Sequence, residues 1–373
     1  DNYSRTRFHN YYCQTTKIGV EPIEAGRTVR GGDILKWQDI EIHVLNTPGY
    51  TRGSVTYTMD LDGKKFAFTG DLICTDGKIP DLYSFQDSLG NIAGYHGYAT
   101  RLGQLISSLQ LIDGQNPDII IPARGEIITN PRESIAKLIG RIRAVYSNYL
   151  SISAYRWYFA ERMQKMSDHV IGENVAVPSI SYADVLKNSP PSWYRHISNT
   201  NLVVSDDGSI FVIDCGTESA LREISKLVES GSIKSIDGVF VTHYHDDHTD
   251  FINKITEKYG CPVYVTPHLK EIIENPSDFN LPCLTHEQIK DLRIVEDKSK
   301  MKWKEFLLTF FYFPGQTIYH DAVLFEKIND ERIFFTGDSF TPSGIDDYCL
   351  LNRNLLHPGM GYFKCIDILK ELP

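Results

Sequence analysis

The sequence predicts an α/β fold, because short apolar strands alternate with helical segments along its second half. The run Ile210-Phe211-Val212-Ile213 predicts one buried strand, and Val239-Phe240-Val241-Thr242 predicts another. Between them, Thr217 suits the N-cap of an amphipathic helix. The apolar residues of that helix recur with helical spacing on one face: Ala220, Leu221, Ile224, Leu227 and Val228.

A cluster of metal-binding residue types directly follows the second strand, in the segment His243-Tyr244-His245-Asp246-Asp247-His248. Three of the chain's 12 histidines lie in this segment, beside two carboxylates. Neutral imidazoles and carboxylates are ligands that zinc and similar divalent ions prefer in proteins. Histidines also occur in loops without binding metal, but their density at a strand end favours a metal site.

The HxHxDH pattern of this segment resembles the sequence signature of the metallo-β-lactamase-fold hydrolases. Asp214, in Asp214-Cys215-Gly216, is similar to the first motif of that family, whose aspartate supports a ligand. Asp338, after the apolar run 333–336 and Gly337, is similar to the family's bridging aspartate. The resemblance covers about residues 195–373 and implies an αββα sandwich.

The resemblance also implies a role for each residue of the cluster. His243 and His245 would bind a first metal. Asp247 and His248 would bind a second metal, and Asp338 would bridge both. A metal-bound hydroxide would then attack the substrate, with Asp247 as the catalytic residue that orients the water. The implied cofactor is Zn²⁺, one or two ions, with Fe or Mn as alternatives.

The third motif departs from the family pattern. The family places a histidine ligand after Pro-Gly, whereas this chain has Gln316 after Pro314-Gly315. His320 lies four residues later and is the alternative ligand; otherwise it faces the substrate or supports a ligand. An amide oxygen is a poorer zinc ligand than imidazole, so the sequence favours His320 and leaves Gln316 a supporting role.

Three classes of function are compatible with these motifs. The first is a hydrolase of a small ester, lactone, thioester or amide. Redox relatives resemble a pattern with Glu at the third motif position, whereas this chain has Asp246, which favours hydrolysis. The second class is a nuclease or phosphodiesterase similar to the ribonuclease Z branch. The third is a non-catalytic binding or scaffold protein whose sites have degraded.

Composition sets bounds on partners and compartment. The formal net charge of −10 argues against an extended nucleic-acid surface, so a small-molecule substrate is expected. The seven cysteines lack CxxC spacing and predict free thiols. No apolar run is long enough to span a bilayer, and no signal peptide is visible. The compartment is cytoplasmic by default, although the true N-terminus is expected to be absent.

An internal repeat sets the expected domain organisation. Lys36-Trp37, Pro48-Gly49 and Gly70-Asp71 recur as Lys302-Trp303, Pro314-Gly315 and Gly337-Asp338 at nearly equal intervals. Both copies resemble the second half of a metallo-β-lactamase fold. The expected domains are the C-terminal half of a degenerate copy (1–129), a helical connector and linker (130–194), and a nearly complete domain lacking its last strand and loop (195–373).

The first copy has lost its ligand residue types. Tyr50 stands in the position of Gln316, and Ser54 in the position of His320. Arg124 stands where the family has its last histidine, and arginine cannot bind a cation because it stays protonated. Only Asp71 remains. The chain is therefore expected to be a fragment of a longer tandem protein, whose first copy is structural or covers the substrate.

Overall fold

The computed structural model describes most of the chain, with gaps. The described residues are 24–80, 82, 85, 99–173, 175–177, 189–279, 283–328, 331–345, 359 and 361–372. They form two compact units, which are treated separately below. Unit 1 comprises the described residues from 24 to 177, and unit 2 comprises those from 189 to 372.

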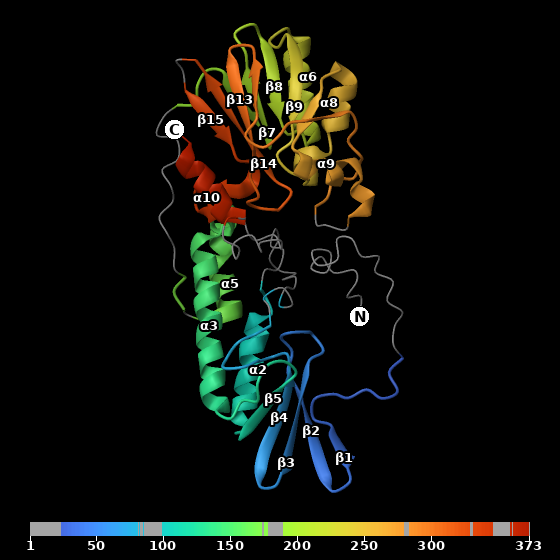
Figure 1. Ribbon diagram of the computed structural model, residues 1–373, viewed down its shortest axis with the longest axis vertical. Helices are drawn as coiled ribbons and strands as arrows, with labels where there is room; N and C mark the ends of the chain where they lie inside the picture. Colours follow the sequence, from blue (N-terminus) through green and yellow to red (C-terminus); the bar gives the residue numbers. More distant parts are fainter. Residues whose placement is uncertain are drawn as a thin grey trace. The chain divides into compact units, whose positions relative to one another are not determined.

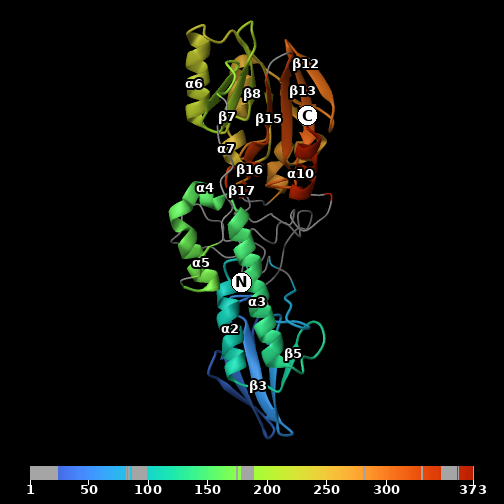
Figure 2. The same cartoon turned by 90° about the vertical axis from the view of Figure 1, so that its left-hand side faces the viewer.

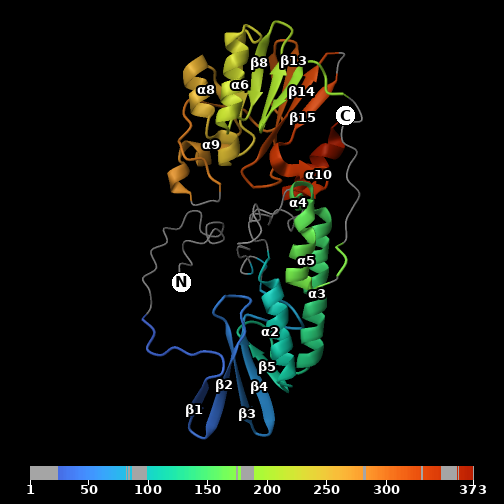
Figure 3. The same ribbon diagram turned by 180° about the vertical axis from the view of Figure 1, so that it is seen from behind.

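Unit 1 contains a five-stranded sheet with the order β1-β2-β3-β4-β5. The strands β1 to β4 pair with one another in antiparallel order, and β5 runs parallel to β4. The helices α2, α3 and α5 lie side by side next to this sheet (Figure 3). The elements are β1 (Ile34–Trp37), β2 (Ile40–Asn46), β3 (Val55–Leu61), β4 (Lys64–Gly70), α2 (Leu102–Gly114), β5 (Ile119–Pro122), α3 (Pro131–Ile152), α4 (Tyr155–Phe159), the 3-10 turn Ala160–Arg162 and α5 (Met163–Ile171).

The two faces of the unit 1 sheet are both apolar but differ in burial. On one face, Ala67 and Ile120 are fully buried in a core shared with Leu105 and Leu109 of α2 and Leu138 of α3. The opposite face carries half-buried apolar side chains around a groove of about 300 Å³. The groove is lined by Leu35, Ile42, Tyr57, Met59 and Phe68.

Helix α3 lies within the segment 130–194, for which the sequence predicts a helical connector and linker. Its apolar residues Ile135, Leu138 and Ile142 recur with helical spacing, and all three are buried. They pack in the same core as the unit 1 sheet and α2. The bounds of the expected domains stay predictions.

Unit 2 contains two larger sheets. The first has the order β11-β10-β9-β8-β7-β6, and the second has the order β12-β13-β14-β15. The elements of the first half are β6 (Tyr194–Ile197), β7 (Thr200–Val204), β8 (Ser209–Ile213), α6 (Glu218–Glu229), β9 (Ser235–Phe240), α7 (Asp246–Thr249), α8 (Ile252–Tyr259), β10 (Val263–Val265), α9 (Pro267–Glu274), the 3-10 turn Pro276–Asp278 and β11 (Leu292–Ile294). The remaining elements are β12 (Lys300–Trp303), β13 (Phe306–Tyr312), β14 (Asp321–Lys327), β15 (Arg332–Phe335), the 3-10 turn Gly337–Ser339, β16 (Phe340–Thr341), β17 (Gly344–Ile345) and α10 (Gly361–Glu371).

The elements of unit 2 stack in four layers (Figures 1 and 2). Helices α6, α8 and α9 cover the outer face of the first sheet, and α10 covers the outer face of the second sheet (Figure 1). Three apolar clusters lie between successive layers. The central cluster is rich in aromatic residues and joins Phe211 and Phe240 of the first sheet to Phe310 and Phe325 of the second. The α/β prediction and the two-sheet sandwich are therefore confirmed for unit 2.

Local signals in the sequence explain how the first layer of unit 2 forms. Strand β8 is buried at every position, as expected for a strand with helices on one face and a sheet on the other. Thr217 caps α6 by accepting a hydrogen bond from Ala220 N at 3.2 Å. Strands β8 and β9 are parallel, so both end at the same edge of the sheet. None of the described helices has the length and apolarity needed to cross a membrane.

Each unit contains strands that pair in the same register. Val44 pairs with Tyr57 and Tyr57 with Phe68 in unit 1. In unit 2, Phe310 pairs with Val323 and Val323 with Phe335, at the positions that the internal repeat makes equivalent. That unit 1 is a degenerate copy of a metallo-β-lactamase half-domain, and that the chain is a tandem fragment, stay predictions.

Candidate metal centre

The predicted ligand residues of unit 2 gather at one edge of its two sheets. Asp214 directly follows β8, and residues 243–248 follow β9 and lead into α7. Asp338 lies in the 3-10 turn that follows β15. These segments are far apart in the sequence but meet in space because the strands that carry them end at the same edge.

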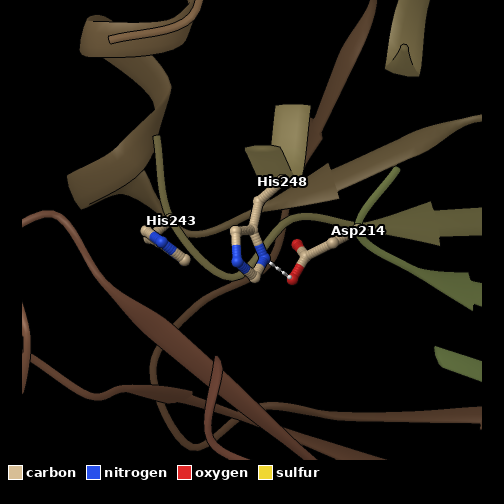
Figure 4. A group of neighbouring side chains, drawn as sticks. All are labelled: Asp214, His243 and His248. Atoms are coloured by element: carbon tan, nitrogen blue, oxygen red, sulfur yellow. Dashed lines mark hydrogen bonds and ion pairs between the residues drawn. The ribbon is translucent and has the colours of Figure 1, made fainter. Parts of the chain in front are cut away.

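Asp214 organises the histidines from behind. Its Oδ1 accepts a hydrogen bond from Thr242 N at 2.7 Å, and its Oδ2 accepts one from Thr242 Oγ1 at 2.7 Å. His248 Nδ1 also donates to Oδ2, at 2.8 Å (Figure 4). Asp214 adopts φ 62°, a left-handed conformation that costs energy for a non-glycine residue. The sequence analysis predicted a supporting role for Asp214, and this hydrogen-bond network provides one.

This network fixes which imidazole nitrogens can bind metal. Because His248 Nδ1 donates to Asp214, the neutral ring carries its lone pair on Nε2. Thr242 Oγ1 uses its proton toward Asp214, so it accepts from His243 Nδ1, 2.9 Å away. His243 Nε2 then carries its own lone pair, and it is buried without a hydrogen-bond partner among the described residues. A buried imidazole nitrogen in this state suits a metal ion.

Three groups of side chains could hold a metal ion, and two of them share Asp338. The third, formed by Asp214, His243 and His248, coincides with the hydrogen-bond network described above. Of the two groups that share Asp338, one contains His243, His245 and Asp338, and the other contains Asp247, His248 and Asp338. Within each group the candidate atoms lie within 4.8 Å of one another. Asp338 Oδ2 is 3.9 Å from His243 Nε2, while Asp338 Oδ1 is 3.3 Å from His248 Nε2. The carboxylate thus faces one group with each oxygen, as a bridging ligand would.

Burial and charge set the protonation of the cluster. Burial, together with the neighbouring imidazoles, holds the pKa of His243 well below its usual range, which keeps this ligand neutral. Burial opposes the charged form of His248, but the Asp338 and Asp214 carboxylates raise its pKa well above the usual range. Asp338 is also penalised by burial, yet His248 and the other histidines hold its pKa below the usual range. The opposite pKa shifts of His248 and Asp338 come from their mutual attraction, and a bound cation would take the place of the His248 proton.

Asp247 is the most exposed member of the cluster. Half of its side chain is accessible, whereas the side chain of His248 is 5% accessible. Partial burial raises the pKa of the Asp247 carboxyl group, while the neighbouring His248 lowers it. Asp246 holds a different position: its Oδ1 accepts a hydrogen bond from Asp247 N at 2.9 Å, and it belongs to neither ligand group.

Asn199 is a site residue that the sequence analysis missed. It lies in the turn between β6 and β7 and donates from Nδ2 to Asp247 Oδ2 at 2.7 Å. The contact joins residues 48 positions apart, and no motif or periodicity marks it. A polar residue in a turn is common, so the sequence carried no signal for this role.

Gln316 and His320 occupy different places around Asp338. Gln316 is 2% exposed, and its Nε2 lies 3.5 Å from Asp338 Oδ2. His320 is fully buried and stacks on His243 with a centroid distance of 4.7 Å. Its Nε2 lies 3.4 Å from Ser339 Oγ, and no ligand group among the described residues contains it.

Two glycines allow this close packing. A Cβ on Gly216 would lie 1.9 Å from the Asp247 carbonyl carbon, so only glycine permits the Asp214 loop to contact the start of α7. A Cβ on Gly337, which has φ 52°, would lie 2.6 Å from His320 Cε1. Both glycines therefore bring ligand-bearing backbone segments together.

The described residues of this chain that match a known protein family lie within unit 2. Residues 193–350 match the family model described as the metallo-beta-lactamase superfamily. The chain is 28% identical over 152 residues to a probable metallo-hydrolase of Methanocaldococcus jannaschii, covering 39% of this chain and 71% of that protein. It is 29% identical over 73 residues to a hydroxyacylglutathione hydrolase of Marinomonas sp., covering 20% of this chain and 27% of that enzyme.

One solved structure aligns with part of this chain. The crystal structure of BJP-1, a subclass B3 metallo-beta-lactamase of Bradyrhizobium japonicum, aligns with 46% of this chain and 67% of its own. The sequence identity is 15% and the TM-score is 0.36.

Proposed function

We propose that this chain, whose residues 193–350 belong to the metallo-beta-lactamase superfamily of metallo-hydrolases, is a metal-dependent hydrolase of a small acyl substrate. The substrate class is an ester, lactone, thioester or amide. The observation that carries the proposal is the pair of ligand groups that share Asp338. The similarity to a hydroxyacylglutathione hydrolase supports a small acyl compound as the substrate.

The proposed ligands are His243, His245 and Asp338 for one ion, and Asp247, His248 and Asp338 for the other. A pair of Zn²⁺ ions, or of Fe or Mn, supplies a Lewis acid and a water-derived nucleophile near neutral pH. The Asp214 network holds the imidazoles in the tautomer that presents Nε2. The ligand positions are thereby preorganised.

In the proposed reaction, Asp247 transfers the proton of the attacking water. Asp247 is half exposed, and Asn199 fixes one of its carboxylate oxygens. It is placed to accept a proton from the attacking water and to return it to the leaving alcohol, thiol or amine. The acyl–heteroatom bond breaks as the new acyl–oxygen bond forms, and the proton balance closes within the site.

The test is turnover of a panel of esters, lactones, thioesters and amides by the metal-reconstituted chain. Hydrolysis of at least one class is expected. Asp247→Ala should lower kcat by about 100-fold or more, because it removes a proton acceptor and a ligand. Asp246→Ala is the matched control and should stay within about threefold, because its side chain belongs to neither ligand group.

Three outcomes would count against the proposal. Turnover of a phosphodiester with none of the acyl compounds would indicate a nuclease or phosphodiesterase instead. No turnover of any compound would favour a binding or scaffold protein. Equal losses in Asp246→Ala and Asp247→Ala would show that the register of the motif is wrong.

A further inference from the structure

We infer that Gln316, and not His320, is the third protein donor beside His243 and His245, and that it shifts the ion preference of this site from zinc toward a harder ion. The inference rests on the proposed function, because it concerns the same metal centre. The sequence favoured His320 on ligand strength alone, whereas the geometry separates the two candidates.

The bridging carboxylate defines the side on which each candidate lies. Asp338 Oδ2 faces the group that contains His243, whose Nε2 is 3.9 Å away. Asp338 Oδ1 faces His248 on the other side. The Gln316 amide lies 3.5 Å from Oδ2, so it belongs to the side of His243 and His245.

The backbone holds the Gln316 side chain in this place. Gln316 N donates to Ser339 Oγ at 3.3 Å. The preceding Gly315 packs so closely on Ser339 that a Cβ would lie 2.3 Å from its Oγ. Ser339 follows Asp338 directly, so the position of Gln316 is tied to the segment that bears the bridging carboxylate.

The amide can present oxygen to a cation. Its oxygen and nitrogen are nearly equivalent in shape, so a half turn of the amide places Oε1 where Nε2 now lies. A bound cation would favour that orientation, because an amide oxygen attracts a cation and an N–H group repels it.

His320 contacts the back of the site. Its ring is nearly parallel to that of His243, with an interplanar angle of 12°, so it covers the ring face and not the lone pair. One ring edge packs against Gly337 Cα, and Nε2 lies near Ser339 Oγ. His320 therefore packs on a ring face of His243 and beside Ser339, and it belongs to no ligand group among the described residues.

The resulting donor set determines the ion. Two imidazoles, one carboxylate and one amide oxygen contain more oxygen than a three-histidine site does. Oxygen donors suit Mn²⁺ and Fe²⁺ relative to Zn²⁺. A histidine at position 316 would restore a nitrogen-rich set and shift the preference toward zinc.

The experiment measures metal affinity of the full 373-residue chain by calorimetric titration of the chelator-treated protein with MnCl₂ and with ZnCl₂. Gln316→His should bind zinc about tenfold or more tightly than the parent, and Gln316→Ala should bind manganese about tenfold more weakly. His320→Ala is the matched control and should change either affinity by less than about threefold. Because His320 is buried, His320→Asn is included, and thermal unfolding checks that each variant is folded.

The outcomes separate this inference from the proposed function. Loss of affinity in both His320 variants, with Gln316→Ala and Gln316→His unchanged, overturns the assignment of Gln316 and restores His320. Unchanged affinities in all four variants also overturn it. In both cases metal still binds, so the proposed metal centre survives. Failure of the parent chain to bind either ion would remove both the inference and the proposed function.

Discussion

Units 1 and 2 contain the same four-stranded antiparallel arrangement, yet among the described residues only the sheet of unit 2 is covered on both faces. Val323 and Phe325 of β14 are fully buried against the first sheet of that unit. Their counterparts Tyr57 and Met59 in β3 are half-buried beside the groove of unit 1. The strand pairing therefore forms without a second sheet among the described residues of unit 1.

The difference teaches which layers the candidate metal site needs. The candidate histidine ligands and Asp214 are carried by the first sheet of unit 2, and the second sheet contributes Asp338 and Gln316. Unit 1 contains the counterpart of the second sheet only, within its described residues. A metal centre in this architecture needs both layers, so a sheet with the correct pairing is not sufficient.

The corresponding position in unit 1 carries different chemistry. Asp71 follows β4 as Asp338 follows β15, and Arg124 Nε lies 3.4 Å from Asp71 Oδ1. A guanidinium group thus neutralises the carboxylate whose counterpart faces the ligand groups in unit 2. Tyr50 packs edge-on against Phe85. In unit 1 the carboxylate at this position takes part in an ion pair.

The largest expected effect comes from substituting the two aspartates at corresponding positions, Asp338 and Asp71, by alanine. Asp338→Ala should lower hydrolytic kcat/KM by more than about 100-fold, because it removes a carboxylate shared by both ligand groups. Asp71→Ala should leave it within about twofold. Steady-state kinetics on the best acyl substrate check both. Equal losses would mean that unit 1 takes part in catalysis, and the contrast between the units would fail.

The next effect concerns stability. Phe325→Ala should reduce the free energy of unfolding by about 3–5 kcal/mol, because it leaves a cavity between two sheets. Met59→Ala should cost about 1 kcal/mol, because its face is half-buried. Urea unfolding followed by tryptophan fluorescence measures both. A cost for Met59→Ala as large as that for Phe325→Ala would show that this face is covered in solution.

The smallest effect is expected at the ion pair of unit 1. The Arg124 side chain is 61% exposed, so solvent screens its attraction to Asp71. Arg124→Ala should change the free energy of unfolding by less than about 1 kcal/mol, and the metal content should not change. A gain of bound metal in this variant would show that Asp71 still belongs to a latent cation site.

The sequence predicted what is local and left open what depends on three-dimensional packing. His243, His245, Asp247 and His248 could be selected because their spacing carries the motif, and the structure brings them together with Asp338. Their roles as ligands stay predictions. The sequence favoured His320 over Gln316 on ligand strength, because both lie in a loop where no periodicity shows which side chain faces Asp338.

Long-range contacts account for the other omissions. Asn199 contacts Asp247 only because the turn after β6 reaches the start of α7, and the sequence contains no trace of that approach. The apolar stripe of α3 was visible, but its docking onto the unit 1 core depends on which sheet face is available. Periodicity identifies buried faces, and only the assembled layers identify their partners.

The most direct test of the central claim is elemental analysis of the chelator-treated chain after reconstitution with divalent ions and desalting. The account predicts up to about two ions per chain, with most of the metal lost in His245→Ala and in His248→Ala, because each removes a ligand nitrogen. Asp71→Ala should retain the parent content. Less than about a tenth of an ion in the reconstituted parent, or full retention in both histidine variants, would contradict a metal centre at the sheet edge of unit 2.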